Sequence, residues 1–405
     1  MRVQHELSED QAFFQQTTRK FLAAECPIAT VRALEPEPRG FDPEWWRRGA
    51  ELGWTSMLVA EADGGGCLSE HGLFDLVLVA EEMGRLVAPG PLVPVNVVAD
   101  ALSRAGSPDQ RAAVLPGLLA GTAVAAWCGV TPVAGARDGD AVVLRGRVSL
   151  VEAGAQAQHL LVTVDLPEGP TQVLVPADAP GLTVTPLGGL DLVRRFASIA
   201  FDGVTVPADA VVGPVGGAAD QIEHQLQVAG VLQCAETVGV ADAMFERTLE
   251  YLGDRYSFGR PLSSYQALKH RVADDKMALE ASHAIATAAA VAVATEAADA
   301  GEVVSAAKAW IGPHVTELLQ DCVQLHGGIG VTWEHDLHLY LRRATVNRVT
   351  YGTPEEHAER VAASWFSAAA PARGAPRVRA RRPRADGRDR SRRAGASGRG
   401  SAGEP

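Results

Sequence analysis

A change of periodicity in the middle of the chain most limits the folds that this sequence can adopt. Short runs rich in Val, Leu and Ala, separated by Gly, Pro and Asp, follow one another between about residues 122 and 213. Such runs are typical of the strands of a compact β-domain. The flanking segments instead repeat apolar residues at the three- and four-residue spacing of helices. The sequence therefore predicts a helical region, a β-domain and a second helical region.

The first helical region is predicted over residues 1–121. Four segments in it show helical spacing of apolar residues: 9–25, 42–54, 71–87 and 107–121. Asp42 can cap the second of these, and Pro43 suits its first helical position. The glycines at 64–66 and the segment PGPLVP at 89–94 are predicted to separate the helices.

The second helical region, residues 214–370, contains three long segments, at 221–256, 263–298 and 303–328. The middle segment is rich in alanine, which favours a place inside a bundle where helices approach closely. Residues 371–405 hold eleven arginines against three acidic residues, so this tail carries +8 and the rest of the chain −20. A Pro-, Gly- and Ser-rich segment of this kind indicates a disordered appendage. Contact with nucleic acid or anionic lipid is the less favoured alternative.

Composition excludes several other classes of protein. The 405 residues include five scattered cysteines with no paired spacing for zinc or redox chemistry, which predicts reduced thiols, no metal site and a cytoplasmic location. We find no continuous apolar run of about 18 residues and therefore expect no transmembrane helix. The polar, acidic N-terminus is unlike a secretory signal.

Four motifs identify a family. They are GWTSMLVAEADGGG at 53–66, FDGVTVPADAVVG at 201–213, RYSFGRPLSSYQALKHRVADD at 255–275 and QLHGGIGVTWEHDLHLYLRRA at 324–344. In this order, over residues 5 to about 365, the chain resembles the acyl-CoA dehydrogenase family. The resemblance implies a mainly α fold with a central β-domain: an N-terminal helical domain, a small β-barrel or sandwich, and a C-terminal four-helix bundle. It also implies FAD as cofactor and assembly into dimers or tetramers.

The resemblance places Arg255 and Ser257 on the FAD pyrophosphate, with Phe258 packing near the flavin end. The planar fork of an arginine suits phosphate oxygens. The loop with Gln324, Gly327 and Gly328 is expected to meet the ADP half of an FAD held mainly by the neighbouring subunit. Paired glycines allow the backbone to approach a nucleotide closely. By the same resemblance, Thr353 bonds to the cofactor and Glu355 provides a second polar contact.

The catalytic base of the family is missing from its usual place. Family members carry a glutamate in a Tyr-Glu-Gly-Thr-like turn, where this chain has Tyr351. A phenol with a reference pKa of ~10 is a poor base near neutral pH. Some members place the glutamate on the first long helix of the last domain, near Ala229 here, and Glu236 lies about two turns further on. Glu236 is therefore a candidate for a displaced base, and His326 and His357 are weaker ones.

The β-domain also departs from the family pattern. Members embrace the flavin ring with a Thr-Glu-Pro…Gly-Ser-Asp stretch and a Trp-Ile-Thr/Ser turn. Here only Thr131, Pro132 and a shortened loop ending in Asp138 remain, and Leu150 stands in place of the aromatic residue. The residues expected on the ADP half are present, whereas much of what would hold the ring is absent.

Three functions remain open at this point. The favoured one is the base-lacking subunit of a hetero-oligomer that desaturates an acyl-CoA, because the ending TWEHDLHLYLRRA resembles the heteromeric members that degrade steroid side chains. The second is a self-sufficient homo-oligomeric dehydrogenase with Glu236 as base. The third is a non-dehydrogenating binding member of the fold. Acyl-CoA and an electron-transfer flavoprotein are the expected partners. Binding to a membrane or to nucleic acid is not expected.

Overall fold

The computed structural model describes residues 7–368. Residues up to Ser364 form one compact unit, and those from Trp365 onward belong to a separate one. The Arg-rich tail predicted at 371–405 lies outside the described residues.

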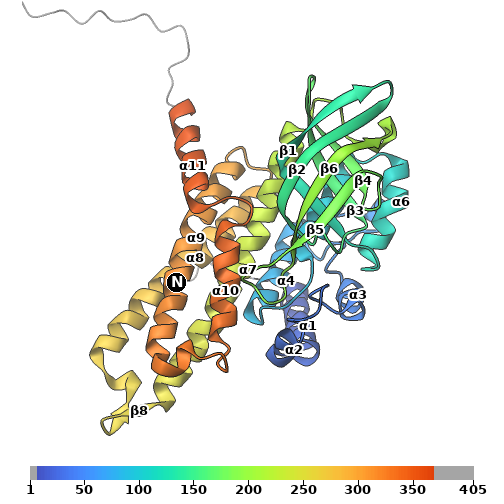
Figure 1. The fold of residues 1–405 in the computed structure, drawn as a ribbon. Coiled ribbons are helices and arrows are strands. Elements are labelled where there is room, and N and C mark those ends of the chain that lie inside the picture. The colour runs from blue at the N-terminus through green and yellow to red at the C-terminus, as the bar shows by residue number, and fades with distance from the viewer. Residues whose placement is uncertain (1–6, 369–405) are drawn as a thin grey trace, which may run out of the picture. The chain divides into compact units, whose positions relative to one another are not determined.

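Six helices precede the sheet (Figure 1): α1 (Glu9–Glu25), α2 (Ile28–Ala33), α3 (Pro43–Glu51), α4 (Gly72–Arg85), α5 (Leu92–Ala105) and α6 (Pro108–Leu119). Asp42 caps α3 as predicted, since its carboxylate accepts a hydrogen bond from the Glu44 backbone N–H at 2.8 Å. The segment PGPLVP separates two helices as predicted, since Pro89, Gly90 and Pro91 lie between α4 and α5, but the helix α5 that begins at Leu92 was not expected. Pro94 lies in the first turn of α5, where a helix has no use for its backbone N–H.

The middle of the chain forms one seven-stranded sheet of order β5-β6-β2-β1-β3-β4-β7. Its strands are β1 (Ala125–Asp138), β2 (Ala141–Glu152), β3 (His159–Leu166), β4 (Gly169–Pro176), β5 (Leu182–Leu187), β6 (Phe196–Val206) and β7 (Val211–Val212). β1 and β3 pair in parallel, and the other pairings are antiparallel. The pairing of β2 with β6 shifts register between Val148 and Val151, and Leu150 there has a φ of 58°. This irregularity redirects the end of β2.

The last part of the chain is a bundle of long helices (Figure 1): α7 (Ala219–Asp254), α8 (Gln266–Ala294), α9 (Ala300–His326), α10 (Leu337–Val349) and α11 (Pro354–Ala368). A hairpin of β8 (Tyr256–Ser257) and β9 (Arg260–Pro261) connects α7 to α8. Helices α4 and α7 approach closely at two glycines. A Cβ on Gly84 would lie 2.0 Å from the Glu236 carbonyl oxygen, and one on Gly239 would lie 2.0 Å from that of Glu81.

Two described helices, α7 and α8, are long and apolar enough to cross a membrane by length and composition. The expectation of no transmembrane helix rested on the lack of a continuous apolar run of about 18 residues, and this finding does not contradict it. The apolar window of α7 is 94% buried, and that of α8 is 39% buried. A core helix passes the same test, so the finding is weak support for a membrane span.

The α4–α7 crossing yields a stability prediction. Gly239→Ala should lower the free energy of unfolding by about 1–3 kcal/mol, because the new methyl group has no room beside Glu81. Gly253→Ala, on the same helix with nothing within 4 Å of its Cβ, should instead raise it by up to about 1 kcal/mol. Urea unfolding of both variants measures the difference. Equal effects of the two would refute the close crossing.

Candidate active site

Five charged side chains meet in a buried cluster between the sheet and the long helices. We call Glu152, Asp191, Arg194, Glu236 and Arg343 the charge cluster. All five side chains are at most 7% exposed. Glu152 ends β2, Asp191 and Arg194 lie in the loop before β6, Glu236 is on α7 and Arg343 is on α10. The cluster therefore joins segments far apart in the chain.

The two arginines bridge the carboxylates. Arg194 Nη2 lies 2.7 Å from Glu236 Oε2, and its Nε lies 3.2 Å from Glu152 Oε1. Arg343 Nη1 donates to Glu236 Oε1 at 2.6 Å and its Nε donates to Asp191. Arg343 also donates to the backbone carbonyls of Val87 and Ala88, just after α4. Ion pairs taken out of water need this degree of hydrogen bonding.

Glu236 is not placed as a proton-abstracting base. Its carboxylate accepts from Arg194, Arg343 and Asn347, the last at 2.9 Å. Burial alone would raise the pKa of Glu236, but the two arginines hold it below its usual value. A general base needs a free lone pair and a pKa near the working pH. This geometry argues against the displaced-base hypothesis.

Tyr351 lies where the resemblance places the base, in the turn between α10 and α11, with a φ of 61°. Its hydroxyl donates to Glu152 Oε2 at 2.8 Å, and its ring is 5.8 Å from that of Trp127. Burial and the nearby Glu152 carboxylate raise the pKa of Tyr351 well above its usual value. Burial also raises the pKa of Glu152. The turn thus presents a neutral phenol that is already bonded to the protein.

Lys308 on α9 fixes the backbone of this turn. Its amine donates to the carbonyls of Asn347 and Thr350, at 2.8 and 2.9 Å, and to the side chain of Gln233. Burial lowers the pKa of Lys308 to about 8. The amine therefore satisfies carbonyls that the end of α10 leaves without helical partners.

The residues expected to bind the pyrophosphate and the ADP half of FAD lie together at one end of the bundle. Tyr251, one turn before Arg255, donates to the His326 carbonyl at 3.1 Å and stacks on its ring at 4.4 Å. This contact brings the β8–β9 hairpin beside the loop with Gln324, Gly327 and Gly328. Arg255 and Gln324 are exposed, and no carboxylate or other side chain among the described residues pairs with the Arg255 guanidinium. A Cβ on Gly327 or Gly328 would meet nothing within 4 Å.

This end of the bundle fits a phosphate-bearing ligand that approaches from outside. Phe258, at the hairpin tip, is 97% exposed, and the Ser257 carbonyl accepts from Tyr265. A free guanidinium and an open glycine backbone are groups that bind a pyrophosphate.

Thr353 and Glu355 lie elsewhere. Thr353 caps α11, exchanging hydrogen bonds with Glu356, and Glu355 is exposed, 4.0 Å from Arg348. The cap lies near Gly312, fourteen residues before the α9 end at His326. At 1.5 Å per residue, about 20 Å of helix separates the two sets. The structure therefore does not bring all predicted cofactor residues to one place.

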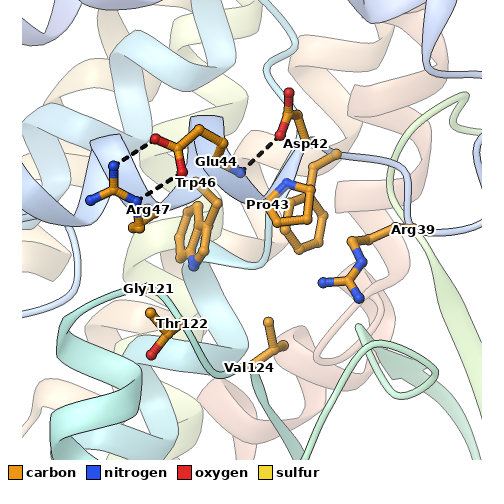
Figure 2. Close-up of a pocket in the computed structure, with 10 residues that line it drawn as sticks. Arg39, Asp42, Pro43, Glu44, Trp46, Arg47, Gly121, Thr122 and Val124 are labelled. Atoms are coloured by element: carbon orange, nitrogen blue, oxygen red, sulfur yellow. Dashed lines mark hydrogen bonds and ion pairs between the residues drawn. The ribbon is translucent and has the colours of Figure 1, made fainter.

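The segments expected around a flavin ring are closed on one another. Tyr351 lies against both Glu152 and Trp127, and Leu150 is 67% exposed. The cavity lined by Glu152 and Arg194 has a volume of about 20 Å³. A larger cleft of about 440 Å³ lies at the start of α3, and its wall includes Arg39, Phe41 and Thr122 (Figure 2). None of the predicted site residues lines that cleft.

The chain combines a helical part, a mixed sheet and a bundle of long helices, and its motifs lie at their expected positions. Together these features define a class of flavoenzyme oxidoreductases. Family models described as acyl-CoA dehydrogenase, N-terminal domain and acyl-CoA dehydrogenase, C-terminal domain match residues 8–122 and 217–366. The acyl-CoA dehydrogenase IpdE2 of Mycobacterium tuberculosis is 31% identical over 353 residues, 86% of this chain and 95% of that protein. The chain belongs to the acyl-CoA dehydrogenase family.

Two solved structures resemble this one closely. A variant of the Tcur3481-Tcur3483 steroid ACAD has a TM-score of 0.81 and 30% identity, covering 89% of this chain and 99% of that one. The ChsE4-ChsE5 complex from Mycobacterium tuberculosis has a TM-score of 0.82 and 26% identity, covering 91% and 100%. The expected family, fold class and enzyme class, an oxidoreductase acting on CH–CH groups, are confirmed, and the family cofactor is FAD.

Sequence reasoning missed Asp191, Arg194 and Arg343. The only signal was a pair of arginine doublets, Arg194–Arg195 and Arg342–Arg343, each following apolar residues. Such doublets also occur on solvated surfaces, so the pattern alone does not reveal burial.

Asp191 should make the free energy of unfolding depend on pH in the acid range. Burial opposes its ionisation, but Arg343 lowers its pKa from 3.8 to about 2. The ionised carboxyl therefore stabilises the fold fully above pH 3.8, and this contribution is lost as the pH falls toward 2. Asp191→Asn should be less stable than the unmodified chain near neutral pH. The difference in free energy of unfolding between this variant and the unmodified chain should narrow by on the order of 2 kcal/mol in acid.

Urea unfolding between neutral pH and about pH 2 measures this gap, with Asp140→Asn, an exposed residue of the β1–β2 turn, as control. A gap that does not change with pH would contradict the ion pair.

Proposed function

We propose that this chain is a subunit of an FAD-dependent acyl-CoA dehydrogenase that introduces an α,β double bond into an acyl-CoA thioester. We propose further that it is the subunit without a catalytic base and works beside a second chain of the family that has one. The observation that carries this proposal is Tyr351 in the base position, neutral, buried and bonded to Glu152.

The reaction requires two events at the substrate. A carboxylate of raised pKa takes the α-proton, while hydrogen-bond donors stabilise enolate character at the thioester carbonyl. FAD, when bound, accepts the β-hydrogen as hydride. Neither Glu236 nor Tyr351 meets the first requirement, because Glu236 is held by two arginines and Tyr351 already donates to Glu152. Glu152 is in turn occupied by Tyr351 and by its ion pair with Arg194. The proton must then be taken by the second chain.

The contribution of this chain is to hold the cofactor of its partner. Arg255 is free to bind pyrophosphate oxygens, and the open backbone at Gly327 and Gly328 can approach the nucleotide. Ser257, Phe258 and Gln324 lie at the same end of the bundle and would complete this contact. Thr353 and Glu355 are too far away to share it.

The relatives support a lipid or steroid substrate and a heteromeric assembly. One solved structure at 30% identity is a variant of a steroid ACAD, and another at 26% identity is the ChsE4-ChsE5 complex. We therefore propose a steroid- or lipid-derived acyl-CoA as substrate. An electron-transfer flavoprotein as electron acceptor and a cytoplasmic location complete the proposal.

Activity should depend on co-expression. The purified single chain should show no acyl-CoA dehydrogenation, and co-expression with a family chain that carries glutamate in the turn should produce it. In that complex Tyr351→Phe should retain activity within about two-fold, because the phenol is not the base. Dye-coupled turnover measures both. Full activity of the single chain, or loss of activity in the Phe variant despite an intact complex, would refute the proposal.

Flavin retention should depend on Arg255. In the co-expressed complex, Arg255→Ala should reduce bound FAD at least ten-fold at limiting FAD, because a charge-assisted contact to phosphate is lost. Arg137→Ala, an exposed arginine of β1, is the matched control and should have no effect. The visible absorbance of the flavin after gel filtration gives the ratio. Equal retention in the two variants would exclude the proposed grip.

A further inference from the structure

We propose that the charge cluster and Tyr351 permanently fill the space in which family members hold the flavin ring, so that this chain has no ring site of its own. Glu152 is the residue that closes it. This inference rests on the proposed function, since it concerns where the flavin of the assembly lies. It adds that the chain meets FAD only through the Arg255 end of the bundle.

The first support is distance. The three segments that would surround a ring contribute Trp127, Glu152 and Tyr351. The Tyr351 hydroxyl is 2.8 Å from Glu152, and the rings of Trp127 and Tyr351 are 5.8 Å apart. A planar ring between two groups needs about 3.5–4 Å of van der Waals separation on each side. These segments contact one another instead.

The second support is volume. The cavity beside Glu152 and Arg194 measures about 20 Å³. This is the space open to the centres of water-sized spheres, and about 10–15 Å³ of such space is needed to hold one water. An isoalloxazine ring therefore does not fit into this cavity, whose wall includes Glu152, Gln156 and Arg194.

The third support is the identity of residue 152. Counting two positions from Leu150, Glu152 falls where family members have the hydroxyl residue of their Trp-Ile-Thr/Ser turn. Its longer, acidic side chain reaches both Arg194 and Tyr351, at 3.2 and 2.8 Å. Leu150, in the place of the aromatic residue, is 67% exposed with a φ of 58° and faces solvent. At position 152, an acid bonded within the chain thus replaces the hydroxyl residue of the family.

The fourth support is that the cluster is complete without a ligand. Asp191 accepts from Arg343 and from the backbone N–H groups of Val193 and Arg194. Glu236 accepts from Arg194, Arg343 and Asn347, and Glu152 accepts from Tyr351 and forms an ion pair with Arg194. Entry of a ring would separate buried charges from their partners, which is strongly unfavourable.

Flavin stoichiometry tests the inference. The co-expressed complex should contain about one FAD for every two chains, and the purified single chain should contain almost none, whether or not FAD is added. One FAD for each chain in either preparation would overturn the inference. It would not overturn the proposed function if the complex alone remained active, so the two failures are distinguishable.

A substitution of Glu152 distinguishes a residue that closes the ring space from one that contacts a flavin ring. Glu152→Gln should leave the flavin content and visible spectrum of the complex unchanged but lower the temperature of unfolding of this chain. Glu168→Gln, an exposed carboxylate of the β3–β4 turn, should change neither. A shifted flavin spectrum in the Glu152 variant, with the Glu168 variant unaffected, would show that Glu152 contacts a ring and would overturn the inference.

Discussion

The pairing of five buried charges is the interaction on which the arrangement of this protein depends. Arg194 and Arg343 connect a loop of the sheet, the end of β2 and two helices of the bundle, and Arg343 also binds carbonyls at the end of α4. Removing one partner of such a pair typically costs about 3–5 kcal/mol, because the remaining charge stays buried. The cluster therefore couples the N-terminal helices, the sheet and the bundle into one unit.

Helices and strands followed from local periodicity, and these were predicted well. Residues 9–25 became α1 with the same bounds, and the β-rich stretch between about residues 122 and 213 holds the strands β1 to β7. The helix α5 was missed because its first turn contains Pro94, which marks a break in most contexts but is tolerated there. Local patterns decide element type, whereas burial of a charge depends on segments brought together from elsewhere.

The candidate site shows the same division. The family resemblance could place Tyr351 at the position of the base and Arg255 beside the loop with Gly327. It could not show that Glu236, attractive as an acidic residue on the right helix, is bound by Arg194 and Arg343. Those arginines lie 42 and 107 residues from Glu236. A base and a structural carboxylate look alike in sequence and differ only in their neighbours.

Lys308 holds the backbone of the turn at Tyr351 in place. The amine holds the backbone of the turn through the carbonyls of Asn347 and Thr350. Shape and reactivity are therefore encoded separately here. A substitution at position 351 can therefore alter the chemistry of this turn while its backbone stays in place.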